Sequence, residues 1–283
     1  MLKLLNPNYI ISKMKISKQI ILIFTFLILH LSCSSDSDNQ NSENSDSNSS
    51  VTIPLEVYKK VYGVTSEITI SNGFVYINTN GVPDHKSPYF KDTKWHDTMY
   101  EAYDVSNPNL FHTGSFNLNP NRVSELSINF KIPNSPLKAS SSQPTSMGPI
   151  GVALNGIPFY NQYAGMNEPL TREINSFDNY NGHPAPLSPG SENSSSGRYH
   201  YHMEPFWITS NSGKDALLGF LLDGFPVYGP LENGKTITSS DLDAYHGHSH
   251  STKEFNDGIY HYHTTADSPY INGSGYYGSP GTV

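Results

Sequence analysis

Apolar and polar residues alternate along several short stretches of this chain, and a period of two residues is typical of half-buried β-strands. Residues 123–132 show this alternation. The segments 67–70 and 74–77 are rich in β-branched and aromatic residues, and they flank the turn sequence Ser71-Asn72-Gly73. An Asn-Gly pair favours the tight turns of β-hairpins, so we predict a hairpin over residues 67–77.

Two further apolar runs, at 151–154 and 217–222, are short and stand next to Gly or Pro. Such runs favour buried strands over helices. A helical period extends over no more than a turn or two near Ser239–Tyr245, where Ser239 or Ser240 is the expected N-cap. We therefore expect an all-β or β-dominated fold, sandwich or barrel-like, with few short helices.

The second half of the chain contains an internal repeat. Residues 151–160 (GVALNGIPFY) and 219–228 (GFLLDGFPVY) match at Gly, Leu, Gly, Pro and Tyr, with Asn155 aligned to Asp223. Each block is followed by a Gly-His pair and then by a Tyr-His-Tyr-His tetrapeptide, at Gly182-His183 and 199–202 and at Gly247-His248 and 260–263. We predict two similar β units, 151–204 and 219–267, within a domain over 145–280, with an N-terminal β region over 53–144.

The two tetrapeptides carry the candidate chemistry. Alternate residues of a strand point to the same face, so the two histidines of each tetrapeptide share one face and the tyrosines share the other. Imidazole is a ligand for Zn, Cu, Fe and Ni, and two imidazoles on one face can converge on one ion. We predict a divalent transition-metal site, copper or zinc, whose ligands are His200, His202, His261 and His263.

Two geometries are compatible with this pattern. All four histidines meet on one metal at a pseudo-twofold axis, or each half holds its own site. In the second case the site is completed by His183 or His248 and by Asp223 or Asn155. His85 is a further secondary candidate because it follows an Asn-Gly-Val-Pro turn.

Other titratable residues carry weaker signals. The stretch His246–His250 lies among Gly and Ser, which predicts a solvated loop. Asp215 and Glu232 have no evident acid/base partner in the sequence. Asn155 and Asp223 are equally compatible with turn chemistry, since both residue types favour positive-φ turns.

Composition narrows the class of protein. The 283 residues include 17 Lys and Arg against 25 Asp and Glu, a formal charge of −8, which argues against a nucleic-acid partner held by charge. A single Cys, Cys33, excludes an internal disulfide and a multi-cysteine metal site. The content of charged residues is low and that of Tyr, Gly and Pro is high, which argues against a helical bundle.

The first fifty residues indicate secretion. Lysines precede a short apolar run, Ile20–Leu31, which is shorter than a membrane-spanning helix and ends just before Cys33. We predict a bacterial lipoprotein signal peptide over 1–33 with Cys33 as the lipidation site. Residues 34–52 are almost all Ser, Asp and Asn, which predicts a disordered linker. The expected location is extracytoplasmic, with a lipid anchor in the outer membrane as the only membrane contact.

With both Tyr-His-Tyr-His tetrapeptides, Gly182-His183 and the segment 223–230, the chain resembles the YHYH-domain family of secreted and lipid-anchored proteins over roughly 145–280. The resemblance implies an extracytoplasmic domain and supplies no reaction. Our leading hypothesis is a lipoprotein that binds or handles copper or zinc, with a metal or small molecule as ligand. The alternatives are a metal-dependent redox or hydrolytic enzyme, and a ligand-binding or adhesion module whose histidine network is structural.

Overall fold

The computed structural model describes residues 51–108, 110–187 and 196–283, which belong to one compact unit. The predicted signal peptide, Cys33 and most of the linker lie outside these residues. The described part contains seventeen strands, three short α-helices and five 3₁₀ turns. The expectation of a β-dominated chain with few short helices is confirmed, and the strands described form no closed barrel. Within the same ranges, no helix is long and apolar enough to cross a lipid bilayer.

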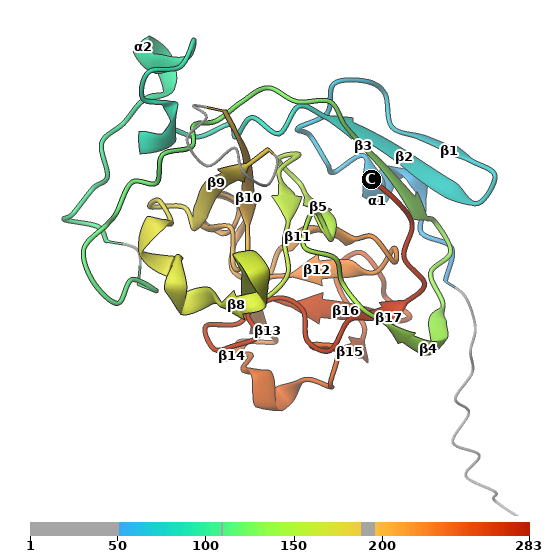
Figure 1. Cartoon of the computed structure of the whole chain (residues 1–283). Helices are drawn as coiled ribbons and strands as arrows, with labels where there is room; N and C mark the ends of the chain where they lie inside the picture. Colours follow the sequence, from blue (N-terminus) through green and yellow to red (C-terminus); the bar gives the residue numbers. More distant parts are fainter. Residues whose placement is uncertain (1–50, 109, 188–195) are drawn as a thin grey trace, which may run out of the picture. The chain divides into compact units, whose positions relative to one another are not determined.

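An eight-stranded sheet organises the molecule (Figure 1). Its order is palindromic with respect to the two repeats, because each strand of the first half has a counterpart at the mirrored position. From one edge to the other the strands are β15 (Gly247–His250), β16 (Ile259–His263), β12 (Pro226–Tyr228), β11 (Leu217–Leu221), β5 (Gly151–Ala153), β6 (Pro158–Phe159), β10 (Gly197–Tyr201) and β9 (Gly182–Pro186).

The register of the two central strands places a pseudo-twofold axis between them. Val152 of β5 pairs with Phe220 of β11 in the antiparallel ladder, and these two residues are equivalent in the repeat. Outward from this pair, both halves continue through an antiparallel strand, a parallel strand and a final antiparallel strand. The first Tyr-His-Tyr-His tetrapeptide therefore lies near one end of the sheet, on β10 and the residue after it, and the second lies near the other end, on β16.

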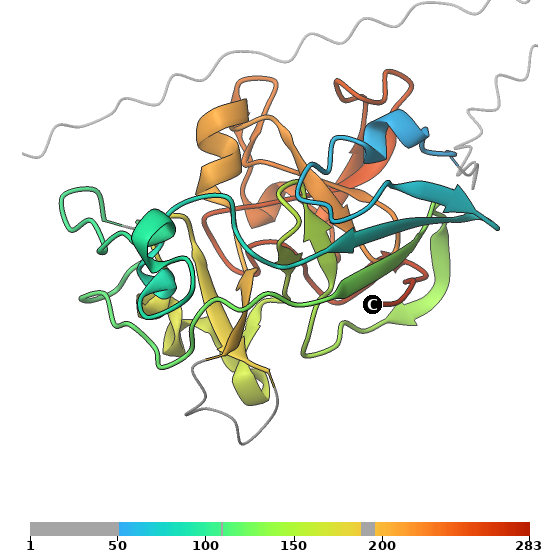
Figure 2. The same ribbon diagram turned by 90° about the horizontal axis from the view of Figure 1, so that it is seen from above.

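Smaller sheets surround this one. Figures 1 and 2 both show the three-stranded sheet at one side of the unit and the α2 segment at the other. The three-stranded sheet comprises β1 (Thr69–Ser71), β2 (Phe74–Thr79) and β3 (Ile128–Pro133). The two-stranded sheets pair β4 (Lys138–Gln143) with β17 (Tyr276–Gly278), β7 (Tyr163–Ala164) with β8 (Glu168–Pro169), and β13 (Leu231–Glu232) with β14 (Lys235–Thr236).

The predicted hairpin forms, and its turn has the expected backbone. Asn72 and Gly73 have φ values of 51° and 78° between β1 and β2. The alternating stretch 123–132 is a regular strand only in its second half, β3, whereas Val123 forms an isolated bridge with Gly197. Two consecutive polar residues, at positions 124 and 125, interrupt the two-residue period at the point where the ladder fails.

Helical elements are short. They are α1 (Leu55–Tyr58), α2 (His96–Met99), α3 (Phe206–Ser212) and the 3₁₀ turns η1 (Pro88–Phe90), η2 (Gly165–Asn167), η3 (Leu170–Arg172), η4 (Ile174–Ser176) and η5 (Ser239–Asp241). The turn expected near 239–245 is η5, but the expected caps were wrong. Thr238 caps it, in a reciprocal capping box with Asp241.

One hydrophobic core joins the large sheet to the N-terminal region. It contains Ile53 and Ile77 from the N-terminal region as well as Val152, Phe220 and the tetrapeptide tyrosines. Tyr199, Tyr201 and Tyr262 are fully buried or nearly so. The tyrosines of each tetrapeptide thus fix β10 and β16 in the core, while the intervening histidines face the opposite side of the sheet.

Candidate metal centres

Three histidine rings converge at the β9–β10 end of the large sheet. The Nε2 atom of His200 lies 3.1 Å from Nε2 of His183 and 2.9 Å from Nε2 of His202. His183 reaches this group because it pairs directly with His200 in the β9–β10 ladder. We call His183, His200 and His202 the first centre; their ligand atoms all lie within 4.8 Å of one another.

The protonation of these rings follows from what their other nitrogens contact. Nδ1 of His200 lies 3.0 Å from the carbonyl oxygen of Arg198, and Nδ1 of His202 lies against the carbonyl oxygen of Asn161. A carbonyl oxygen can only accept, so both Nδ1 atoms carry the proton. Nδ1 of His183 lies 2.7 Å from Oγ of Ser176, whose own hydroxyl donates to the carbonyl of Glu173. All three rings therefore place Nδ1–H on an oxygen.

Burial keeps these rings neutral. Desolvation lowers the pKa of His202 to about 4 and holds the pKa values of His183 and His200 well below their usual range. A neutral ring protonated at Nδ1 has a bare lone pair at Nε2. Three such lone pairs point at one another with no proton between them, an arrangement that a cation would stabilise.

A carboxylate stands beside the first centre. Oε1 of Glu173 lies 3.5 Å from Nε2 of His202 and 3.8 Å from Nε2 of His183. Burial raises the pKa of Glu173 to about 7. Glu173 sits between η3 and η4, so it approaches the histidines from a connecting segment and not from the sheet.

The other end of the sheet carries the second centre, which comprises Glu232, His248, His261 and His263. Nε2 of His263 lies 3.1 Å from Nε2 of His248, and Nε2 of His261 lies 3.3 Å from Oε1 of Glu232. The pairing of His248 with His261 in the β15–β16 ladder repeats that of His183 with His200. Burial lowers the pKa of both His261 and His263 to about 4.

Glu232 takes a more central place in the second centre than Glu173 takes in the first. Its Oε1 faces His261 and His263, and its Oε2 lies 3.4 Å from Nε2 of His248 and 3.4 Å from Nδ1 of His250. Glu232, for which the sequence indicated no partner, thus contacts four histidines.

The two centres share the hydrogen bonds that orient their ligands. In both, the first tetrapeptide histidine donates Nδ1–H to the carbonyl two residues earlier, that of Arg198 or Ile259. In both, the second tetrapeptide histidine, His202 or His263, donates Nδ1–H to a backbone carbonyl oxygen. This carbonyl belongs to the residue after the last tyrosine of the matched block, Asn161 or Gly229. Metal-ligating histidines characteristically donate the other ring N–H in this way, which fixes the tautomer and the ring orientation.

The turns that contain the two Gly-His pairs are held by the same hydrogen bonds in both halves of the repeat. The carboxylate of Asp178 accepts hydrogen bonds from the backbone N–H of Gly182 and from the hydroxyl of Tyr199. Asp243 does the same for Gly247 and Tyr260. The repeated signal Asp-x-Tyr-x-Gly-His, at 178–183 and 243–248, therefore builds the turn that delivers His183 and His248.

Three residues predicted as secondary ligands lie elsewhere. Asp223 accepts from the hydroxyl of Tyr262 at 2.6 Å, and the equivalent Asn155 donates to the hydroxyl of Tyr201 at 3.1 Å. His85 also contacts the Tyr201 hydroxyl, at 3.1 Å, through Nε2. Among the described residues, Asp223 and His85 belong to neither centre, and the side-chain amide of Asn155 donates to Asp84 and Tyr201. All three contact the hydroxyl groups of buried tyrosines.

The structure separates the four tetrapeptide histidines into two groups. Four strands lie between β10 and β16, which at the usual strand spacing puts the two pairs roughly 24 Å apart. Of the two geometries left open by the sequence, the arrangement is the one with a separate group in each half, completed by His183 or His248.

Sequence reasoning missed some members of these groups. The stretch 246–250 was expected to be a solvated loop. Ser249 and His250 are exposed, but Gly247–His250 form a strand, β15, which pairs with β16. Glu173 and Glu232 were missed because they come from non-equivalent places outside the matched blocks. No repeat signal could have found them.

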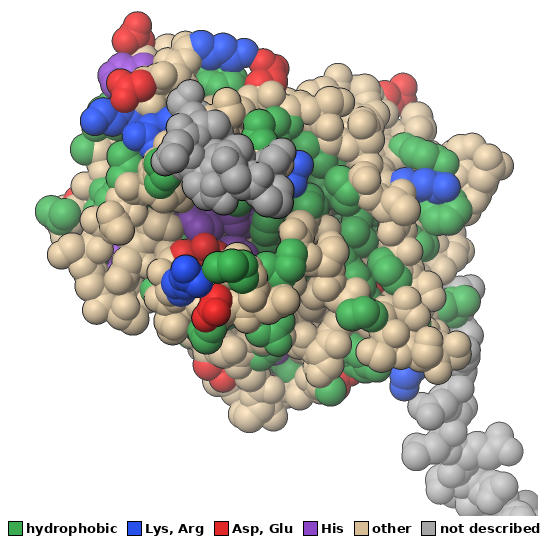
Figure 3. Space-filling view, viewed as in Figure 1, with side chains coloured by type: hydrophobic (Ala, Val, Ile, Leu, Met, Phe, Trp, Pro, Cys, Tyr) green, Lys and Arg blue, Asp and Glu red, His purple; other side chains and the backbone are tan. Residues whose placement is uncertain are grey.

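Each centre borders a cavity. The three histidines of the first centre and Glu173 line a cavity of about 530 Å³, and His261, His263 and Glu232 line another of about 610 Å³. Figure 3 shows histidine side chains at the bottom of a recess, with acidic and basic side chains beside them. Both volumes are in the range of small-molecule sites.

These features define a β-dominated protein with an internally repeated sheet and two buried clusters of histidine and glutamate whose residues are suited to holding a metal ion. A sequence model of the YHYH protein family matches residues 129–236 and 231–275, which span just over half of the chain. The chain belongs to the YHYH protein family. No curated protein and no solved structure matches it.

Proposed function

We propose that the protein binds two transition-metal ions, one at each centre, and that its role is to bind or handle copper or zinc outside the cytoplasm. One observation carries the proposal: neutral imidazoles, already donating through Nδ1, converge through bare Nε2 atoms. A histidine network with a purely structural role would place a donor against each acceptor. Here acceptors face acceptors.

The ligand chemistry supports copper or zinc. The first centre offers three imidazoles with a carboxylate beside them, and the second offers three imidazoles and one carboxylate; neither group contains a thiolate or thioether. Such nitrogen-rich sets suit borderline metals such as Zn²⁺ and Cu²⁺, whereas Mg²⁺ and Ca²⁺ prefer all-oxygen sites.

Metal analysis of the protein, purified without a histidine tag, tests this proposal. We expect about two equivalents of metal per chain after loading with zinc or copper and gel filtration. The double variant His200→Ala/His202→Ala should lose one equivalent, and His261→Ala/His263→Ala should lose the other.

His96→Ala is the matched control, since His96 stacks on Tyr100 and lies outside both centres. It should retain both equivalents. Metal content that is unchanged in the two double variants, with the fold intact by circular dichroism, would rule out these centres as the binding sites.

We further propose that the protein is a lipoprotein tethered through Cys33, with residues 34–52 as spacer. The position of the only cysteine at the end of the apolar run supports this. In a bacterial host the wild-type chain should incorporate radiolabelled palmitate and sediment with membranes. Cys33→Ser should abolish labelling; persistent labelling of this variant would refute the anchor.

A further inference from the structure

We propose that the cavity over the first centre binds a small organic carboxylate, one end of which takes an open position on the metal while the other is held by Arg198. This inference rests on the metal proposed for that centre. It assigns the two centres different roles, with the first accepting an exchangeable ligand and the second holding its metal without one.

Arg198 is placed to bind an anion beside the metal. It lies two residues before His200 on β10, so both side chains leave the strand on the same face, and both line the cavity. Its Nη1 donates to the hydroxyl of Tyr160 at 3.1 Å, and the ring of Tyr160 stacks on His200 at 3.9 Å between centroids. Arg198 is therefore fixed next to a ligand of the first centre.

The guanidinium of Arg198 retains binding capacity in that position. Its Nε atom is buried and has no hydrogen-bond partner among the described residues. Buried donors are normally paired, and the planar guanidinium matches a carboxylate with two parallel hydrogen bonds. An organic carboxylate in the cavity would supply the missing acceptor.

A second buried group in the same cavity is also unpaired. Asn121 is 5% exposed and lines the cavity, with its Nδ2 donating to the carbonyl of Pro184 at 3.3 Å. Its Oδ1 is buried without a partner in the described part of the chain. This oxygen is an acceptor, so a donor on the ligand, such as a hydroxyl group on its carbon skeleton, would satisfy it, while the carboxylate pairs with Arg198.

The charges of the two cavities differ in sign. Arg172 and Arg198 line the first cavity with a single acidic residue, Glu173. The second is lined by two lysines and three acidic residues: Lys60, Lys253, Asp215, Glu232 and Glu254. A divalent metal makes the first cavity strongly positive, and electrostatic complementarity then favours an anion there.

The metal ligands of the two centres also differ, and this difference again favours an exchangeable ligand at the first centre. Glu232 has an oxygen within 4.8 Å of all three histidine nitrogens of the second centre, whereas Glu173 lies outside the corresponding set of the first centre. Sites with three protein ligands leave a position for an exchangeable group, and sites with four are closed. Apolar wall residues such as Met147 and Leu187 suit the carbon skeleton of an organic anion.

Cobalt substitution tests the inference, because the visible spectrum of Co²⁺ reports the ligands on the metal. His261→Ala/His263→Ala isolates the first centre, and His200→Ala/His202→Ala isolates the second. Each variant is loaded with Co²⁺ and titrated with succinate. We expect a saturable spectral change at the first centre and none at the second.

Substitution of the arginine and lysine side chains that line the cavities gives a second measurement, the apparent Kd for succinate. In the variant that retains the first centre, Arg198→Gln should weaken the apparent Kd for succinate about tenfold, the loss expected for a charged hydrogen bond, and Arg198→Lys should recover part of it. Arg172→Gln, at an exposed position, should weaken it less. Lys253→Gln, which removes a cation from the second cavity, should have no effect.

The outcomes separate this inference from the proposed function. Failure of the first centre to bind cobalt contradicts the proposed function. Cobalt binding without a response to succinate, an equal response at both centres, or an unchanged Kd in both arginine variants overturns only the carboxylate site. A response to inorganic phosphate with none to succinate also overturns it, since it would assign the cavity to a different anion.

Discussion

At the scale of single residues, the two halves of the repeat use different groups for one task. Asn155 and Asp223 occupy equivalent positions, and each contacts the hydroxyl of the second tetrapeptide tyrosine, Tyr201 or Tyr262. Asp223 also accepts from the backbone N–H of Gly278 at 2.9 Å. Nevertheless burial raises its pKa to about 6. The carboxylate is thus held in the core at an electrostatic cost.

This cost predicts a pH dependence for Asp223→Asn. The pKa of Asp223 is raised in the folded protein, so folding favours the protonated form, and the wild type loses stability as the pH rises towards and through 6. Relative to the variant, its free energy of unfolding should fall by about 1 kcal/mol between pH 5 and pH 7. Urea denaturation of both proteins at several pH values measures the difference.

Comparing the two proteins at each pH cancels the titration of the buried histidines, which is common to both. Any pH-independent loss from a weaker hydrogen bond shifts all points equally. A difference that is constant with pH, or that changes in the opposite direction, would show that the hydrogen bonds to Asp223 outweigh its desolvation.

At the scale of elements, the Gly-His turns deliver the third histidine of each centre. A Cβ atom on Gly182 would lie 2.1 Å from Oη of Tyr199, and one on Gly247 would lie 2.5 Å from Oη of Tyr260. Only glycine lets the tyrosine ring cross the neighbouring strand and reach Asp178 or Asp243. The glycine, the tyrosine and the aspartate are therefore one packing unit behind each centre.

Gly182→Ala should consequently lower the free energy of unfolding by at least about 2 kcal/mol, because Tyr199 is fully buried and cannot move aside without strain. Thermal or chemical denaturation measures the loss. Gly165→Ala is the matched control: a Cβ there meets nothing within 4 Å, and little change is expected. Equal stabilities of the two variants would contradict the packing role of Gly182.

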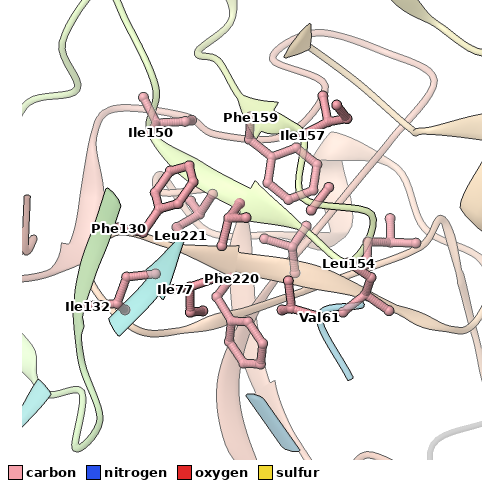
Figure 4. Packing of buried hydrophobic residues seen from close by; sticks show 14 of the residues in the cluster. Val61, Ile77, Phe130, Ile132, Ile150, Leu154, Ile157, Phe159, Phe220 and Leu221 are labelled. Atoms are coloured by element: carbon pink, nitrogen blue, oxygen red, sulfur yellow. The ribbon is translucent and has the colours of Figure 1, made fainter. Parts of the chain in front are cut away.

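At the scale of the whole molecule, the two centres are joined through the middle of one sheet. Phe220 lies on the pseudo-twofold axis opposite Val152, is fully buried, and packs on the ring of Tyr58 at 4.7 Å between centroids. Figure 4 shows it among residues from both the repeat and the N-terminal region, such as Ile77 and Val61.

Phe220→Ala should therefore destabilise the whole unit, by about 3–5 kcal/mol, the usual loss for a large aromatic side chain in a core. Because both halves depend on this packing, fluorescence and circular dichroism should report one common transition. Val105→Ala, at a site 81% exposed, should change stability little. Separate transitions for the two halves of the variant would show that they fold independently.

Local patterns predicted much of this architecture. The hairpin at Asn72 and Gly73, the strands at 151–153 and 217–221 and the opposite faces of the tetrapeptide residues all follow from periodicity and turn chemistry over a few residues. The repeat also indicated His183 and His248 as partners, because each precedes a tetrapeptide at a similar distance in both halves. The sequence analysis did not predict the helix α3 or the cap at Thr238, because the sequence signals for both extend over only a few residues.

The sequence by itself determined that the histidines come in pairs, on one face of a strand, in two copies. Only the tertiary structure decided that the copies form separate groups, because the order of eight strands depends on which edges pair, and this is a long-range property. It also decided that Glu173 and Glu232 join them while Asp223 does not. Proximity between residues far apart in the chain is set by packing and leaves no local periodicity to detect.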